Sequence, residues 1–214
     1  MSLNLSSVLL IAAAIPSIVL HEVSHGWVAN KFGDPTAKNA GRLTLNPIKH
    51  IDPFGTILMP VLMALAHLPA FGYAKPVPVN VNRLRKPRNQ SVYVSLAGPL
   101  TNVILSALAW VVCETMYSSN PNIFLSSNHF FEFFLYLGIV NMILAVFNML
   151  PIPPFDGSAL VERLVPRKHL GAYFRLRAQA LPFAFLFVLL IFWVLPIGSR
   201  IFADLQGWWI SSLF

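Results

Sequence analysis

The stretch "SSVLLIAAAIPSIVLHEVSHGWVAN", residues 6 to 30, joins two features that seldom occur together. Up to Leu20 it is almost entirely apolar, as expected for a helix inside a lipid bilayer. His21, Glu22 and His25 then follow within two helical turns. Ionisable groups on a membrane helix are costly and are usually retained for function. The stretch therefore predicts both a membrane fold and a polar site within it.

The composition of the whole chain supports a membrane protein. Its 214 residues are 56% hydrophobic and only 11% charged, whereas soluble domains carry about 25% charged residues. The formal net charge is +7, but the basic residues fall between apolar segments, as in cytoplasmic loops, rather than on one nucleic-acid-binding face. The single cysteine, Cys113, excludes an internal disulfide.

Five apolar runs are long enough to be considered as membrane segments. They lie at residues 5–31, 54–71, 91–113, 130–150 and 180–197. The first, second and fourth connections between them are rich in Lys and Arg and the third has none, so the first, second and fourth should be cytoplasmic. Both flanks of 54–71 would then be cytoplasmic, and this segment contains Pro60 and Pro69. A re-entrant hairpin is therefore expected there, with four full spans elsewhere.

Two short stretches are typical of strands. They are "GRLTLNP", residues 41 to 47, and "KPVPVNVN", residues 75 to 82, where prolines indicate an edge strand. The tail from 198 to 214 suits a short interfacial helix. The expected fold is an all-α integral membrane protein with about four transmembrane helices, a re-entrant segment and a small membrane-associated β-sheet. A single domain is expected over 1–214, with its core at 5–165 and C-terminal helices at 179–214.

The spacing His21-Glu22-x-x-His25 is the helical zinc-binding motif H-E-x-x-H of metalloproteases. Positions i and i+4 share a helix face, so both imidazoles can reach one ion. Glu22 is offset from that face, which suits a base acting on metal-bound water. A chance cluster at a helix end is the alternative, and the cost of burying these groups in a membrane disfavours it. If the helix reaches the cytoplasmic surface near Lys31, His21 lies about 15 Å inside the membrane, and the site should open toward the cytoplasm.

A catalytic zinc usually has three protein ligands, and the third is not supplied by the longer pattern H-E-x-x-H-x-x-G-x-x-H, because Val28 and Lys31 occupy its last two positions. The candidate carboxylates are Asp34, Asp52 and Asp156. Turn or cap roles are expected for the first two, which adjoin prolines. Asp156 is the second-to-last residue of "NMLPIPPFDG", residues 148 to 157. The prolines of this stretch must break the preceding helix, and irregular backbone near a membrane is tolerated where it lines a wet cavity. Capping of the next helix is the alternative role for this acid.

These residues resemble the site-2 proteases, zinc metalloproteases of peptidase family M50 that cut within membranes. The matching motifs are "HEVSH", "AGPLTN" at 97–102 and "NMLPIPPFDG" at 148–157, in that order. The resemblance implies one catalytic Zn²⁺ held by His21, His25 and Asp156, with Glu22 as the base that activates water. It also implies that Asn148 contacts the substrate backbone or the developing oxyanion.

The resemblance is closest to the short bacterial and archaeal branch of the family, without a PDZ or CBS domain. It implies a multi-pass protein of a bacterial or archaeal cell membrane. One departure is Ser158, which stands where relatives commonly have a second glycine.

The expected activity is hydrolysis of peptide bonds in or near transmembrane helices of protein substrates, as in regulated intramembrane proteolysis. The expected partners are such a substrate, the lipid bilayer and possible regulatory proteins, but no nucleic acid. As a hypothesis, the strand at 75–82 or at 41–45 pairs with an unwound substrate, and 54–71 helps to gate its entry. Two alternatives remain, a membrane metal transporter or metal sensor and a catalytically silent scaffold.

Overall fold

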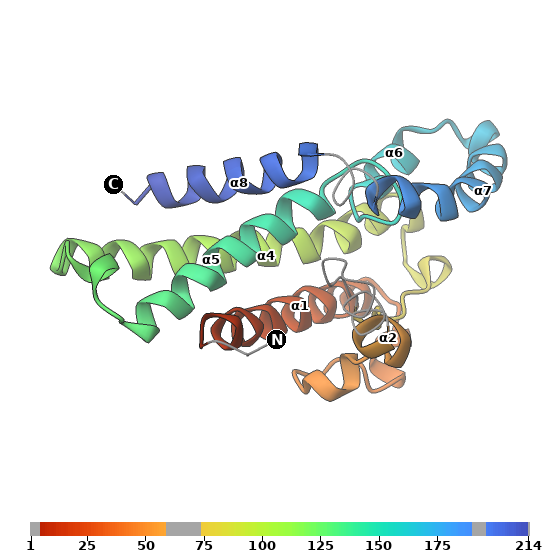
Figure 1. The fold of residues 1–214 in the computed structure, drawn as a ribbon. Coiled ribbons are helices and arrows are strands. Elements are labelled where there is room, and N and C mark those ends of the chain that lie inside the picture. The colour runs from red at the N-terminus through yellow and green to blue at the C-terminus, as the bar shows by residue number, and fades with distance from the viewer. Residues whose placement is uncertain (1–4, 59–73, 190–195, 214) are drawn as a thin grey trace. The chain divides into compact units, whose positions relative to one another are not determined.

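The structure, a computed structural model, describes residues 5–58, 74–189 and 196–213 (Figure 1). Its longer helices are α1 (Leu5–Lys31), α4 (Pro87–Ser119), α5 (His129–Asn148), α7 (Leu170–Leu189) and α8 (Pro196–Ser211). Shorter helical segments are α2 (Thr36–Asn39), η1 (Pro47–His50), η2 (Pro53–Leu58), η3 (Val81–Arg83), η4 (Ile123–Leu125), α6 (Ser158–Leu164) and η5 (Arg167–His169).

Three of these helices, α1, α4 and α5, are long and apolar enough to cross a membrane. Pro16 lies inside α1 and Pro99 inside α4, which lipid-embedded helices tolerate because neighbouring groups satisfy the freed carbonyls. Three candidate spans thus stand among the described residues where about four were expected. The fourth expected span, 180–197, and the expected re-entrant segment, 54–71, lie partly outside the described residues.

The predicted β-sheet is wrong, because the described residues contain helices and no strand. Between 41 and 47 the chain turns, with Gly41 at φ +64° and the Asn46 side chain accepting from the backbone N–H of Ile48. The segment 74–80 has no regular secondary structure. Pro76 and Pro78 remove two ladder donors. Of the remaining amides, those of Val77 and Asn80 donate to side-chain carboxylates instead.

The chain divides into two compact units. The first, Met1–Ser17 with Pro99–Phe214, has a core that includes Cys113, Phe131 and Met142. Trp209 of α8 packs on Gly138 of α5 so closely that a Cβ on that glycine would come within 2.0 Å of the indole ring. The indole Nε1 donates to the Ser106 hydroxyl at 3.0 Å, which fixes α8 to the bundle.

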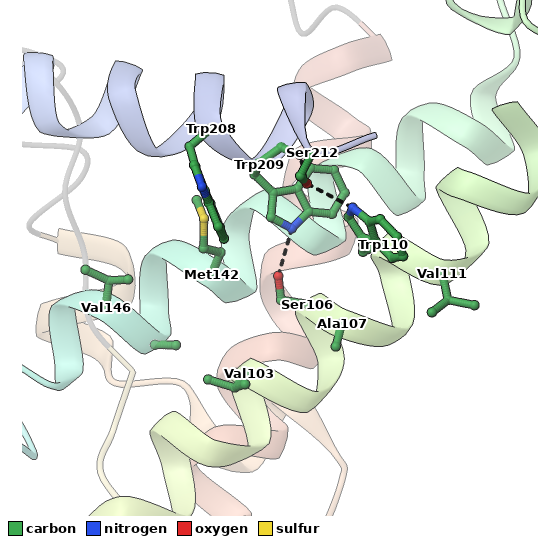
Figure 2. Close-up of a pocket in the computed structure, with 11 residues that line it drawn as sticks. Val103, Ser106, Ala107, Trp110, Val111, Met142, Val146, Trp208, Trp209 and Ser212 are labelled. Atoms are coloured by element: carbon green, nitrogen blue, oxygen red, sulfur yellow. Dashed lines mark hydrogen bonds between the residues drawn. The ribbon is translucent and has the colours of Figure 1, made fainter. Parts of the chain in front are cut away.

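A cavity of about 570 Å³ lies in this first unit among α4, α5 and α8 (Figure 2). Its lining is almost wholly apolar, and its Trp110 and Trp209 indoles both donate to serine hydroxyls. None of the predicted catalytic or metal-binding residues lines it.

The second unit, Ile18–Gly98, has a small core formed by Ala29, Leu84 and Val94. The fully buried Asp34 organises its loops. Its carboxylate accepts from the backbone N–H of Asn80 at 2.6 Å, and from the N–H and hydroxyl of Thr36. The interpretation of Asp34 as a turn-capping residue agrees with these bonds.

Candidate metal centre

Helix α1 brings the two motif histidines to one point. His21 and His25 lie one turn apart, and their ring centroids are 4.7 Å apart with the planes nearly perpendicular. The two Nε2 atoms face each other at 3.1 Å. Both side chains are buried, with 7% and 8% of their surface exposed. Their spacing on the helix therefore gives two converging imidazole nitrogens, as the i, i+4 geometry requires.

Helix α4 fixes the orientation of these rings. His25 Nδ1 lies 2.7 Å from the carbonyl oxygen of Val94, and because a carbonyl can only accept, Nδ1 carries the proton and Nε2 is left for a metal. One turn along α4, a Cβ on Gly98 would come within 2.4 Å of His25 Nε2 and 2.5 Å of His21 Cε1. The α4 backbone thus lies against both imidazoles, and no side chain fits between them.

The segment after α5 folds back tightly and carries Asp156. The N–H of Gly157 donates to the carbonyl oxygen of Asn148 at 2.7 Å. A Cβ on Gly157 would come within 2.3 Å of the Met149 carbonyl oxygen, so the turn requires glycine there. The carbonyl of Asp156 accepts from Ala159 N–H at 3.0 Å as α6 begins. The carboxylate therefore projects from a turn anchored at both ends.

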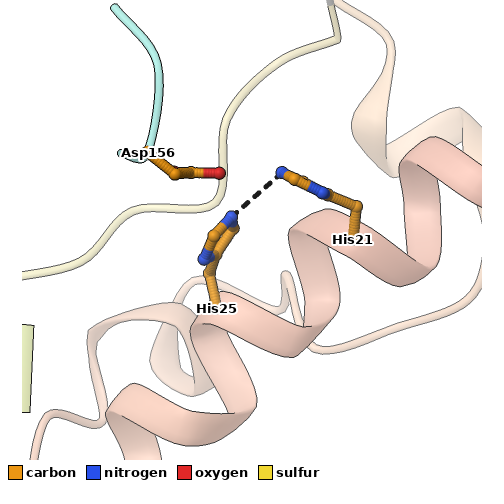
Figure 3. Close-up of side chains that lie close together, drawn as sticks. All are labelled: His21, His25 and Asp156. Carbon is orange, nitrogen blue, oxygen red and sulfur yellow. Dashed lines mark hydrogen bonds between the residues drawn. The ribbon is translucent and has the colours of Figure 1, made fainter. Parts of the chain in front are cut away.

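His21, His25 and Asp156 form a group whose ligand atoms all lie within 4.8 Å of one another (Figure 3). Two imidazole nitrogens and one carboxylate oxygen are the donor types of a catalytic zinc site with an open fourth position. The residues present therefore fit a zinc ion, and the three predicted ligands are brought together.

Glu22 is not part of this group and is held by the segment 74–80 instead. Its carboxylate accepts from the backbone N–H of Val77 at 2.8 Å. The close approach of Val77 depends on Gly26, where a Cβ would come within 2.7 Å of the valine Cγ1. Glu22 is thus anchored next to the histidines and outside the group of three, an arrangement compatible with its predicted role as a base.

Asn148 and Asp52 form local hydrogen bonds that do not connect them to the three grouped residues. The Asn148 amide donates to the Leu144 carbonyl of its own helix at 2.9 Å, so its contact with a substrate stays a prediction. Asp52 accepts from the backbone N–H groups of Phe54 and Gly55, as expected for a turn residue.

Sequence reasoning missed Val94 and Val77, which act through backbone groups that leave no signal in residue type. The close approach at Gly98 could be predicted from the sequence, because a glycine followed by a proline in an apolar run indicates that two helices lie close together.

Comparison with known proteins identifies the family of the chain. The family model described as peptidase family M50 matches residues 9–126 and 115–191. The protein named "Putative zinc metalloprotease YwhC" of Bacillus subtilis (strain 168) is 42% identical over 193 residues, which cover 90% of this chain and 83% of that protein. The similarly named Rip2 of Mycolicibacterium smegmatis is 31% identical over 95% of this chain and 73% of its own length. No solved structure matches the chain.

Proposed function

This chain is a zinc metalloprotease of peptidase family M50, the site-2 protease family, and we propose that it hydrolyses peptide bonds in or near the transmembrane helices of other membrane proteins. The observation that carries the proposal is the H-E-x-x-H motif on α1, a helix apolar and long enough to cross a membrane. A metal site on such a helix meets substrates that are themselves in the bilayer.

His21, His25 and Asp156 are the proposed zinc ligands. Their support is the grouping of their donor atoms within 4.8 Å and the donor set of two nitrogens and one oxygen. When bound, the zinc ion supplies a Lewis acid that polarises a scissile carbonyl and acidifies water. Val94 holds the proton on Nδ1 of His25, so Nε2 presents its lone pair to the ion.

Glu22 is the proposed general base. Its carboxylate takes a proton from the attacking water and later delivers that proton to the nitrogen of the leaving amine. The N–H of Val77 orients the carboxylate by occupying Oε2, which leaves the other oxygen to meet the water. Asn148 is the proposed contact to the substrate backbone or to the developing negative charge.

Access from the cytoplasmic side and a bacterial or archaeal plasma membrane location are part of the proposal. Lys31 ends α1, and Lys and Arg are frequent in the connection that follows, as expected for the cytoplasmic side of a multi-pass protein. Family membership favours hydrolysis over the alternative of metal transport or sensing.

The first test is the zinc content of the detergent-purified protein. Wild type, Glu22→Gln and the control Asp52→Ala should each carry about one zinc, as expected for one catalytic site, whereas Asp156→Ala should carry much less. Cleavage of a fluorescently tagged model transmembrane helix in proteoliposomes should then require Glu22. Retention of zinc by Asp156→Ala would remove Asp156 from the ligand set. A Glu22→Gln variant that cleaves at the wild-type rate would contradict the proposed mechanism.

A further inference from the structure

A network of three buried polar side chains links α1, α4 and α5, which are each long and apolar enough to cross a membrane. Asn102 on α4 donates from Nδ2 to Oδ1 of Asn141 on α5 at 3.1 Å. Asn141 in turn donates to the hydroxyl of Ser17 on α1 at 2.7 Å. All three side chains are fully buried, with 0% exposed. Such groups are costly inside apolar helices and are kept where they are paired.

The side chains of this polar network form hydrogen bonds both to neighbouring helices and to the backbone of their own helix. Besides Ser17, the Asn141 amide donates to the Leu137 carbonyl of its own helix at 2.8 Å, and its oxygen accepts from Asn102. The Ser17 hydroxyl donates to the Ala13 carbonyl at 2.7 Å while it accepts from Asn141. Asn141 thus uses both sides of its amide to join α1 to α4.

The polar network lies close to the two motif histidines along both α1 and α4. Ser17, His21 and His25 follow at intervals of four, so they occupy one face of α1. Gly98 and Asn102 have the same spacing on α4. Gly98 is the residue that lies against both histidine rings. On both helices, therefore, the polar network lies one turn from the place where Gly98 contacts the two imidazoles.

We propose that Ser17, Asn102 and Asn141 are positioning residues, which set the rotation and axial register of α1 against α4 so that His21 and His25 converge on one ion. A rotation of α1 about its axis would swing both imidazoles away from Gly98, and apolar packing alone resists such a rotation weakly because lipid chains are as apolar as the helix surfaces. A directional bond at Ser17 resists it one turn away. This inference rests on the proposed role of the two histidines as metal ligands.

The test is titration of the full-length, metal-free protein in detergent with Co²⁺, whose visible absorption reports ligand geometry without any substrate. Ser17→Ala removes one hydroxyl and adds no atoms, and Asn141→Leu removes the central amide. Each should bind Co²⁺ about 3- to 20-fold more weakly, the range expected for an interhelical hydrogen bond in a membrane protein. The visible spectrum should also change, because the imidazoles no longer converge.

Two control variants distinguish a positioning role from a general loss of stability of the helix bundle. Ser17→Thr keeps the hydroxyl and should keep wild-type affinity and spectrum. Thr115→Ala removes an exposed hydroxyl that donates to the Val112 carbonyl of its own helix and should also match wild type. If Asn141→Leu does not fold, Ser17→Ala and Ser17→Thr decide the question.

The outcomes are distinguishable. Wild-type affinity and spectrum in Ser17→Ala, or equal weakening in Ser17→Ala and Ser17→Thr, would overturn the positioning role while the proposed function stands. Failure of the wild type itself to bind Co²⁺ would overturn the metal site, and with it the positioning role that depends on it.

Discussion

Gly98 of α4 lies against His25 of α1 so closely that a single added carbon would sit 2.4 Å from Nε2, the proposed metal-binding atom. The same carbon would lie 2.5 Å from Cε1 of His21. Contacts this short do not persist between real atoms, so the space beside the two imidazoles is defined by the absence of a side chain at one position.

Gly98→Ala should therefore abolish zinc binding, because the new methyl group displaces one or both imidazoles. Zinc content and cleavage activity should fall together, while the protein still inserts and purifies. The control is Gly171→Ala on α7, where a Cβ meets nothing within 4 Å. A full complement of zinc in Gly98→Ala would show that α1 and α4 can separate without loss of the site.

Val77→Pro should lower the cleavage rate and leave the zinc content unchanged. Proline removes the N–H that Glu22 accepts at 2.8 Å, and Glu22 is not among the grouped ligands. Val77→Ala is the matched control, since it keeps the N–H but loses the side-chain packing against Gly26. Similar losses of activity in both variants would point to packing instead of the hydrogen bond.

The stability that Asp34 contributes should be lost at low pH. Burial alone would raise the pKa of this carboxyl, but hydrogen bonds from Thr36 and Asn80, together with the charge of Arg83, hold its pKa below the usual value. A carboxyl with a lower pKa in the folded state than in the unfolded state adds stability above the unfolded pKa of about 3.9. That stability is lost as the pH falls through the lower, folded value.

Asp34→Asn should consequently destabilise the protein at pH 7, by about 1–3 kcal/mol for a buried group that loses partners. The difference from wild type should shrink as the pH falls below the unfolded pKa of about 3.9 and toward the lower folded pKa, where the folded carboxyl gains its proton. Thermal unfolding in detergent at the two pH values measures this, with the exposed Asp204→Asn as control. An equal difference at both pH values would mean that charge is not involved.

Gly138→Ala should release α8 from the bundle, because its methyl group would come within 2.0 Å of the Trp209 ring. Faster proteolysis near residues 196–211 and a red-shifted tryptophan emission are the expected results. Gly207→Ala places the same methyl group on α8 itself with nothing within 4 Å, and it should match wild type. Unchanged proteolysis in Gly138→Ala would indicate that the indole can move aside while α8 stays docked.

The sequence predicted the elements that depend on periodicity and composition. The apolar run before His21 and the i, i+4 histidines predicted α1 and the convergence of two imidazoles, because a helix fixes both. Three prolines before Asp156 predicted a break after α5, where the turn is found. The same break singled out Asp156 among three candidate carboxylates, and the family resemblance implied its place with the histidines, since no local rule joins residues so far apart.

The expected strands failed for a reason that is visible in particular atoms. Alternating valines at 77, 79 and 81 fit a strand pattern. However, the Val77 N–H donates a hydrogen bond to the Glu22 carboxylate, and the Asn80 N–H donates one to the Asp34 carboxylate. Backbone donors held by carboxylates are not available for a ladder. Those carboxylates come from positions distant in sequence, so alternation alone could not reveal them.

The order in which the site's parts occur along the chain has a consequence for biosynthesis. A ribosome releases His21 and His25 well before Val94 and Gly98, which orient and confine their rings, and Asp156 follows later still. A nascent chain that has inserted only α1 thus holds the motif without its orienting carbonyl or its third proposed ligand. If His21, His25 and Asp156 are the zinc ligands, unfinished chains and early truncation products cannot cleave peptide bonds. Activity then begins only after Asp156 has been synthesised and α6 has begun.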